Sequence, residues 1–278
     1  MDIGYYIFIF ILIIFFVLHK LLYHVGNILL FHPVKCNMII PDSLDGLSIE
    51  NDFITTSDNI KIHYIYIKNP NSKLHFLYAH GNGGNIGQRL DCQTVKYLLK
   101  FGSLLMFDYR GYGKSDGEPS ELGIRKDIKT VWNFMTQNMN IEPNNIGVVG
   151  TSLGCSFAAW LGSDLAKSKL DMPKLIILQS GFFDLKKIAK FKFGNMMENI
   201  SHLFDLECNN YKYIKEIKQY YADYPILILH SKNDDVIPYF HSEKLANKAN
   251  SIMIEISGPH NYLIIDELTD KKISKYLV

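Results

Sequence analysis

Residues 146–154 read IGVVGTSLG, and this stretch decides how the chain folds. Residues 146–149 form a short apolar run typical of a buried strand, and the pattern G-x-S-x-G follows directly. This order predicts a strand that turns sharply into a helix and exposes the hydroxyl of Ser152 at the strand end. Side chains at Gly150 and Gly154 would collide across so tight a turn. Because G-x-S-x-G also occurs in ordinary loops, its meaning depends on the residues at the other strand ends.

Strand-like runs alternate with helical patterns over most of the chain after residue 53. Several runs are almost continuously apolar and are bounded by Gly, Asn or Pro, as expected of strands buried on both faces of a parallel sheet. The alternation predicts an α/β fold with a doubly wound, mostly parallel sheet, in which ligands bind at the carboxyl ends of the strands. The predicted strands are Ile60–Ile67, Leu74–His80, Leu104–Tyr109, Ile146–Thr151, Leu175–Gln179, Ile226–His230 and Ile252–Ile256.

An acid and a histidine follow the last two predicted strands. Asp234 and Asp235 come after the strand at 226–230, and His260 comes after the strand at 252–256. The order Ser, Asp, His at successive strand ends is that of a serine nucleophile with its base and orienting acid. Position favours Asp234 as the acid and leaves Asp235 as a turn or capping residue. The alternative interpretation of the two aspartates is a metal pair or a solvated turn, but no further metal-ligand spacing accompanies them.

A glycine-rich turn, HGNGGN at residues 80–85, follows the strand at 74–80. Such a turn allows a substrate carbonyl to approach closely and offers a backbone N–H to a developing oxyanion. The second N–H is expected from Leu153, which directly follows Ser152 at the start of a helix. The turn matches neither of the common glycine-rich nucleotide-binding patterns, so we expect no nucleotide, no other cofactor and no metal.

The amino terminus carries a candidate membrane anchor. Ile3–Leu18 contains no charged residue, and the apolar span reaches Tyr23 if Lys20 extends toward the lipid headgroups. A cleavable signal is disfavoured because Asp2 replaces the usual positive region and no alanine precedes Ala79. A buried core helix is disfavoured because the span is apolar on every side. We therefore predict a single-pass transmembrane anchor that binds membrane lipid.

These observations divide the chain into an anchor at residues 1–24, a linker at 25–50 and a catalytic domain at 51–278. One lysine and two histidines follow the span, and this small excess of basic residues favours a catalytic domain on the cytosolic side. The formal net charge of +1, without a basic stripe, argues against nucleic acid as a partner. A further motif, DYRGYGKSDG at residues 108–117, is interpreted as structural, with Arg110 expected to hold loop carbonyls.

Five segments together resemble the α/β-hydrolase superfamily, and within it the BEM46-like group with its ABHD13-type and ABHD17-type serine hydrolases. They are FLYAHGNGGNIGQRL, FDYRGYGKSDGEPSELGI, GVVGTSLG, ILILHSKNDDVIP and GPHNYL. The resemblance implies an eight-stranded sheet with a short lid at about 181–223. It also implies Ser152 as nucleophile, Asp234 as acid and His260 as base, with the oxyanion hole at Asn82 and Leu153.

The predicted function is a membrane-anchored serine hydrolase that cleaves carboxylic esters or thioesters, with a lipid or an acylated protein as substrate. The palmitoylated cysteine cluster of the ABHD17-type enzymes is missing, which weakens a direct transfer of their palmitoyl-protein substrates. The lid segment is rich in aromatic residues and methionine, which suits either an acyl pocket or simple packing of helices on the core. Two alternatives remain, an aminopeptidase-type hydrolase of the same fold and a noncatalytic membrane scaffold.

Overall fold

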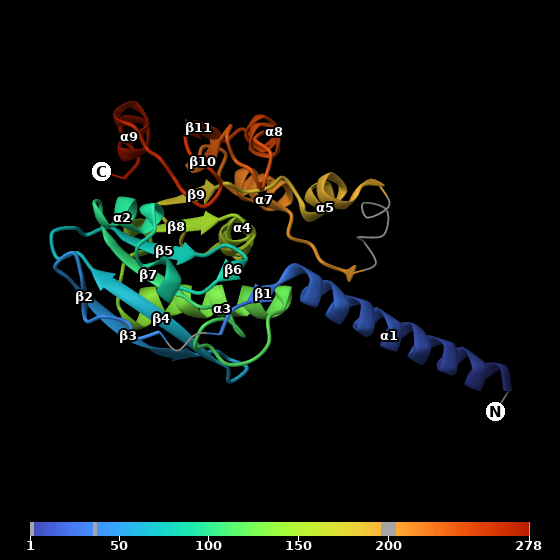
Figure 1. Ribbon diagram of the computed structural model, residues 1–278. Helices are drawn as coiled ribbons and strands as arrows, with labels where there is room; N and C mark the ends of the chain where they lie inside the picture. The colour runs from blue at the N-terminus through green and yellow to red at the C-terminus, as the bar shows by residue number, and fades with distance from the viewer. Residues whose placement is uncertain (1–2, 36–37, 196–203, 278) are drawn as a thin grey trace.

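A single sheet of nine strands forms the centre of the computed structural model, which describes residues 3–35, 38–195 and 204–277 (Figure 1). The strand order is β11-β10-β9-β8-β5-β7-β4-β3-β2. Neighbouring strands from β7 to β11 run parallel, whereas β2, β3 and β4 pair antiparallel at the other edge. The strands are β2 Ser43–Leu44, β3 Leu47–Thr55, β4 Lys61–Lys68, β5 His75–Ala79, β7 Ser103–Phe107, β8 Ile146–Thr151, β9 Leu175–Gln179, β10 Ile226–Ser231 and β11 Ile252–Ile256.

Helices cover both faces of this sheet. Buried side chains of α3, α4, α7 and α8 pack on one face, and those of α2 and α9 pack on the other. Consecutive strand residues therefore alternate between two apolar cores, with Val148 in one and Val149 in the other, which explains the near-continuous apolar runs. The helices are α1 Ile3–Leu30, α2 Gln93–Leu99, α3 Glu121–Asn133, α4 Gly154–Lys167, α5 Leu185–Phe193, α7 Asn210–Tyr220, α8 Phe240–Ala249 and α9 Glu267–Ser274.

The α/β class and the doubly wound, mostly parallel sheet predicted from the sequence are confirmed. All seven strands predicted from apolar runs form, three with the predicted bounds and four with ends that differ by one or two residues. The sheet has nine strands instead of eight because β3 pairs with the two-residue strand β2. The sequence reading missed β3 because most of its side chains are exposed or half-buried, so no apolar run marks it.

The stretch predicted as a linker, residues 25–50, is ordered over its described part and contacts the α/β domain. Helix α1 continues to Leu30 and packs its last turns against α3. The Asn27 side chain accepts a hydrogen bond from the N–H of Glu121 at 2.9 Å, and the Tyr23 hydroxyl accepts one from the N–H of Leu122 at 3.3 Å. These N–H groups belong to the first turn of α3, where the helix has no carbonyl partner for them. The end of α1 therefore caps α3, which a composition-based division of the chain could not reveal.

The first part of α1 projects away from the rest of the molecule (Figure 1). Its large apolar side chains between Tyr5 and Leu21 are mostly exposed, with Phe15 exposing 66% of its surface. The helix is long and apolar enough to cross a membrane, with a candidate span from Tyr5 to Leu30.

The motif at residues 108–117 is structural in its contacts, but one detail of its interpretation is wrong. Arg110 does not hold loop carbonyls. Its guanidinium forms a salt bridge at 2.7 Å with the buried carboxylate of Asp127 and another at 3.0 Å with Asp58. Asp108 is also buried and accepts a hydrogen bond from the N–H of Ile86 at 2.9 Å, which ties two loops together.

Replacement of Gly154 by alanine is expected to destabilise the fold strongly. A Cβ atom at this position would lie 2.1 Å from the carbonyl oxygen of Ala79, so the start of α4 and the end of β5 would have to separate. We expect a loss of about 3 kcal/mol or more in the free energy of unfolding, measured by denaturant titration. The matched control is Gly83→Ala, where an added Cβ meets nothing within 4 Å. Equal stability of the two variants would contradict this account.

Candidate functional site

Ser152 lies in the turn between β8 and α4. Its backbone adopts a φ of +55°, a left-handed conformation that is uncommon for a residue with a side chain. Two constraints hold it there. The N–H of Ser152 donates to the carbonyl of Gln179 at 2.8 Å, and an added Cβ at Gly150 would lie 2.5 Å from the carbonyl oxygen of Gly154. The turn is therefore as tight as the glycine spacing predicted, and such strained residues cluster at functional sites.

His260 follows β11 and lies beside the serine. Its Nε2 atom is 3.1 Å from Ser152 Oγ, and its Nδ1 atom is 2.8 Å and 3.0 Å from the two carboxylate oxygens of Asp234. The backbone N–H of His260 donates to Asp235 at 3.1 Å. The two aspartates thus have different contacts, since one meets the imidazole ring and the other holds the backbone that carries the ring.

Asp234 is fully buried and remains ionised through its hydrogen bonds. Burial alone would raise the pKa of this carboxyl group, but hydrogen bonds from His230, His260 and the N–H of Ile237 hold its pKa well below the usual range. The N–H groups of Val236 and Ile237 donate to one carboxylate oxygen at 2.9 Å and 2.8 Å. A buried carboxylate fixed in this way can orient a histidine ring and stabilise its protonated form.

The sequence analysis missed His230 as part of this group. Its Nε2 atom is 3.2 Å from Asp234 Oδ2 and 2.9 Å from the carbonyl oxygen of Ile237. Its Nδ1 atom lies 2.6 Å from the hydroxyl of Ser242 on α8. The available signal was a histidine at the end of a buried strand, four residues before the candidate acid.

Asn82 and Leu153, the two residues predicted to supply oxyanion N–H groups, lie in the two turns that meet at Ser152. Asn82 belongs to the glycine-rich turn after β5, and Leu153 precedes the first turn of α4. Within the described ranges, neither backbone N–H donates a hydrogen bond to the protein, so both are available to a ligand. The glycine-rich turn passes close to the serine at Gly81, where an added Cβ atom would lie 3.4 Å from the Cβ of Ser152.

A cavity of about 430 Å³ opens at this group of residues. The lining residues are Gly81, Asn82, Gly83, Gly84, Gln88, Arg89, Thr151, Ser152, Val236, His260 and Asn261. Sequence reasoning singled out Asn82, Ser152 and His260 among these, but not Gln88, Arg89, Thr151 or Asn261.

The aromatic residues of the predicted lid do not line this cavity. Phe182, Phe183 and Tyr213 are buried in the core beside α4, and the ring of Phe183 stacks on Tyr211 at a centroid distance of 4.9 Å. Phe191 and Phe193 are exposed on α5. Of the two interpretations of this segment, the packing of helices on the core accounts for the buried rings. Met196 and Met197 lie outside the described residues.

The chain that leaves α1 is bound directly to the glycine-rich turn. Strand β1, His32–Pro33, pairs parallel with β6, Gly83–Gly84. The side-chain amide of Asn82 donates to the carbonyl of Leu30 at 2.7 Å and accepts hydrogen bonds from the His32 N–H at 3.1 Å and the Tyr112 hydroxyl at 3.0 Å. The segment after the apolar helix therefore helps to position a turn that faces Ser152.

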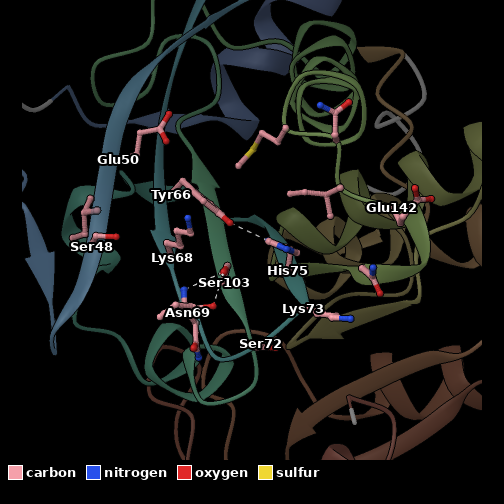
Figure 2. Close-up of a pocket in the computed structure, with 16 residues that line it drawn as sticks. Ser48, Glu50, Tyr66, Lys68, Asn69, Ser72, Lys73, His75, Ser103 and Glu142 are labelled. Carbon is pink, nitrogen blue, oxygen red and sulfur yellow. Dashed lines mark hydrogen bonds between the residues drawn. The ribbon is translucent and has the colours of Figure 1, made fainter.

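A larger cavity, of about 720 Å³, lies at the amino ends of the parallel strands, opposite the strand ends that carry Ser152 (Figure 2). It is lined by the first residues of β5 and β7, His75 and Ser103, and by Tyr66, whose hydroxyl is 3.0 Å from His75 Nδ1. In parallel sheets ligand chemistry occurs at the carboxyl ends of strands, which is the edge that carries Ser152. The smaller cavity is therefore the candidate active site.

Comparisons with known proteins identify the family of this chain. The sequence model of the prolyl oligopeptidase family matches residues 123–261. An uncharacterised protein of Acanthamoeba polyphaga mimivirus, R595, is 32% identical over 251 residues, which cover 83% of this chain and 82% of that protein. The chain belongs to the α/β-hydrolase superfamily. The ABHD-type resemblance holds for a further relative of this hydrolase, the lysophosphatidylserine lipase ABHD12 of Danio rerio. It is 31% identical over 180 residues, which cover 62% of this chain and 46% of the lipase.

The fold of this hydrolase matches that of an esterase of known structure. Pf2001 of Pyrococcus furiosus superposes with a TM-score of 0.69 at 20% sequence identity, over 89% of this chain and 96% of that esterase. At this level of identity the match concerns the fold, and the chemistry has to be argued from the site itself.

His80, buried under the glycine-rich turn, is expected to make stability depend on pH. Its ring stacks on Tyr109 at 4.0 Å, and burial lowers its pKa to about 4. The unfolded chain binds this proton near pH 6.5, so between pH 6.5 and 4 the unfolded state gains protons that the folded state does not take up. The melting temperature of the detergent-solubilised hydrolase should therefore fall as pH decreases across this window. The change of melting temperature with pH should be smaller in His80→Gln than in the wild type. It should be unchanged in His24→Gln, which alters an exposed histidine. The same change with pH in the wild type and both variants would contradict the assignment of this effect to His80.

Loss of the Tyr112 hydroxyl is expected to slow hydrolysis without unfolding the protein. Tyr112→Phe removes the donor to Asn82 and leaves the ring in place, so the turn beside Ser152 should lose part of its positioning. We expect kcat/KM for p-nitrophenyl butyrate to fall about threefold to tenfold, equivalent to one hydrogen bond. Tyr220→Phe, which changes a half-exposed side chain of α7, is the control. Wild-type kinetics in Tyr112→Phe would show that this contact does not support the site.

Proposed function

We propose that this protein is a serine hydrolase that cleaves carboxylic esters or thioesters through an acyl-serine intermediate. The observation that carries the proposal is the continuous chain of contacts from Ser152 Oγ through His260 to Asp234, at 3.1 Å and 2.8 Å. A free serine hydroxyl is a weak nucleophile, and a neighbouring imidazole that accepts its proton makes it a strong one. The proposed roles are nucleophile for Ser152, general base for His260 and orienting acid for Asp234.

In the proposed reaction, Ser152 Oγ attacks the carbonyl carbon of the substrate while its proton passes to His260 Nε2. The carbonyl oxygen becomes an oxyanion that accepts hydrogen bonds from the N–H groups of Asn82 and Leu153. The tetrahedral species then collapses, and the bond to the leaving alcohol or thiol breaks as His260 returns its proton to that group. Water, deprotonated by the same imidazole, hydrolyses the acyl-serine, releasing the carboxylic acid and restoring Ser152.

The membrane is the proposed setting of this reaction. Helix α1 has the length and apolar surface of a transmembrane anchor, and its last turns are packed on the catalytic domain. A site attached in this way meets acylated molecules at the membrane surface, and the name of the lysophosphatidylserine lipase supports a lipid ester as substrate. Acylated proteins and thioesters stay within the proposal because a serine of this kind attacks both carbonyl types. The orientation of the chain in the membrane is proposed with the catalytic domain on the cytosolic side.

Two alternatives compete with this proposal. The match to the prolyl oligopeptidase family favours a peptidase, which would use the same three residues on an amide bond. The described cavity has no carboxylate in its lining to receive a free substrate amino group, which argues against an aminopeptidase. A noncatalytic scaffold would have no need to hold Ser152 in a strained conformation beside an imidazole.

The decisive test is labelling with a fluorophosphonate, followed by a substrate panel. We expect the full-length protein to be labelled and the Ser152→Ala and His260→Ala variants to remain unlabelled, because each loses a partner in proton transfer. Hydrolysis of p-nitrophenyl esters, palmitoyl thioesters and aminoacyl amides then separates the activities. Higher kcat/KM on the amides would replace the esterase proposal by a peptidase, and an unlabelled but folded wild type would favour the scaffold.

A further inference from the structure

The chain contains only three arginines, Arg89, Arg110 and Arg125. Two of them are neutralised by carboxylates. Arg110 forms salt bridges with Asp58 and Asp127, and Arg125 forms salt bridges with Glu121 and Glu207. In the described part of the chain, Arg89 has no carboxylate within 4.0 Å, and it is the arginine that lines the cavity beside Ser152.

The guanidinium of Arg89 lies over the glycine-rich turn. Residue 89 ends a short 3-10 turn, Gly87–Arg89, and its Nη2 atom donates to the carbonyl of Gly83. A Cβ atom on Gly81 would lie 3.7 Å from Arg89 Nη2 and 3.4 Å from the Cβ of Ser152, so the charge stands about one side chain away from the nucleophile. The Nε–H of Arg89 is buried and has no hydrogen-bond partner among the residues that the structure describes.

The rest of the cavity favours an anion. Gln88 and Asn261 are among the polar residues of the lining, and the described lining includes no aspartate or glutamate. A guanidinium without a carboxylate partner, with an N–H donor unsatisfied, is a site for a phosphate or carboxylate group, which it can bind through two parallel hydrogen bonds.

We propose that Arg89 binds an anionic group on the leaving part of the ester, so that the preferred substrates carry a phosphate or carboxylate close to the scissile bond. This inference rests on the proposed esterase function and specifies its substrate class. Arg89 then acts as a specificity-determining residue, because it contributes to the binding of anionic esters an interaction that neutral esters cannot make.

The test compares three octanoyl esters on the full-length protein in detergent: octanoyl glycerol phosphate, the octanoyl ester of glyceric acid and neutral octanoyl glycerol. We expect Arg89→Gln to raise KM for the preferred anionic ester about tenfold to a hundredfold, as loss of a charged hydrogen-bond pair does. The kcat/KM for octanoyl glycerol should fall less, by about the threefold to tenfold that one hydrogen bond to the turn is worth. Arg89→Lys should recover part of the additional loss on the anionic ester because it restores the charge without the planar fork. The two anionic esters distinguish a phosphate from a carboxylate.

Lys100→Gln is the control for loss of one positive charge, because Lys100 is exposed and does not line the cavity. Inhibition by glycerol 3-phosphate should be competitive in the wild type and at least tenfold weaker in Arg89→Gln. Equal losses on neutral and anionic esters would mean that Arg89 only supports the turn, and would overturn the inference while leaving the esterase proposal intact. So would a wild type without preference for either anionic ester. A wild type that neither reacts with fluorophosphonate nor cleaves any ester would overturn both.

Discussion

The contact between the start of α4 and the end of β5 is the constraint on which the rest of the site depends. Gly154 packs so closely on the carbonyl oxygen of Ala79 that no side chain fits between them. This approach forces the chain to turn sharply after β8, which holds Ser152 in its left-handed conformation. It also brings the turn after β8 next to the turn after β5, so that Ser152 lies beside the glycine-rich turn that contains Asn82.

The topology of the sheet supplies the remaining partners. Asp234 follows β10 and His260 follows β11, and both strands run parallel to β8 on the same side of the sheet. Parallel strands end at the same edge, so residues separated by more than a hundred positions meet there without a long connecting loop. The turn formed by residues 234–237 then fixes the Asp234 carboxylate, because the N–H groups of Val236 and Ile237 donate to it.

The sequence was informative where a residue type is required by backbone geometry or by burial. The apolar runs predicted seven strands of the sheet, and G-x-S-x-G together with the acid and the histidine at later strand ends predicted which side chains would meet. It was uninformative where the structure depends on contacts between distant polar groups. The exposed strand β3, the capping of α3 by Asn27, the contact of His230 with Asp234 and the location of Arg89 in the cavity each involve a partner that no local pattern identifies.

The unbroken helix α1 has a consequence for what the site can reach. A hydrolase attached by a flexible linker would sweep through a volume above the membrane. Here Tyr23 and Asn27 of this helix cap the start of α3, and its final carbonyl accepts a hydrogen bond from Asn82 of the glycine-rich turn. Residues 23–30 span about 12 Å along the helix axis, at 1.5 Å per residue. With α1 in a bilayer, Ser152 stays at one height and in one orientation above the lipid, and the proposed active site meets new substrate by lateral diffusion of the whole protein.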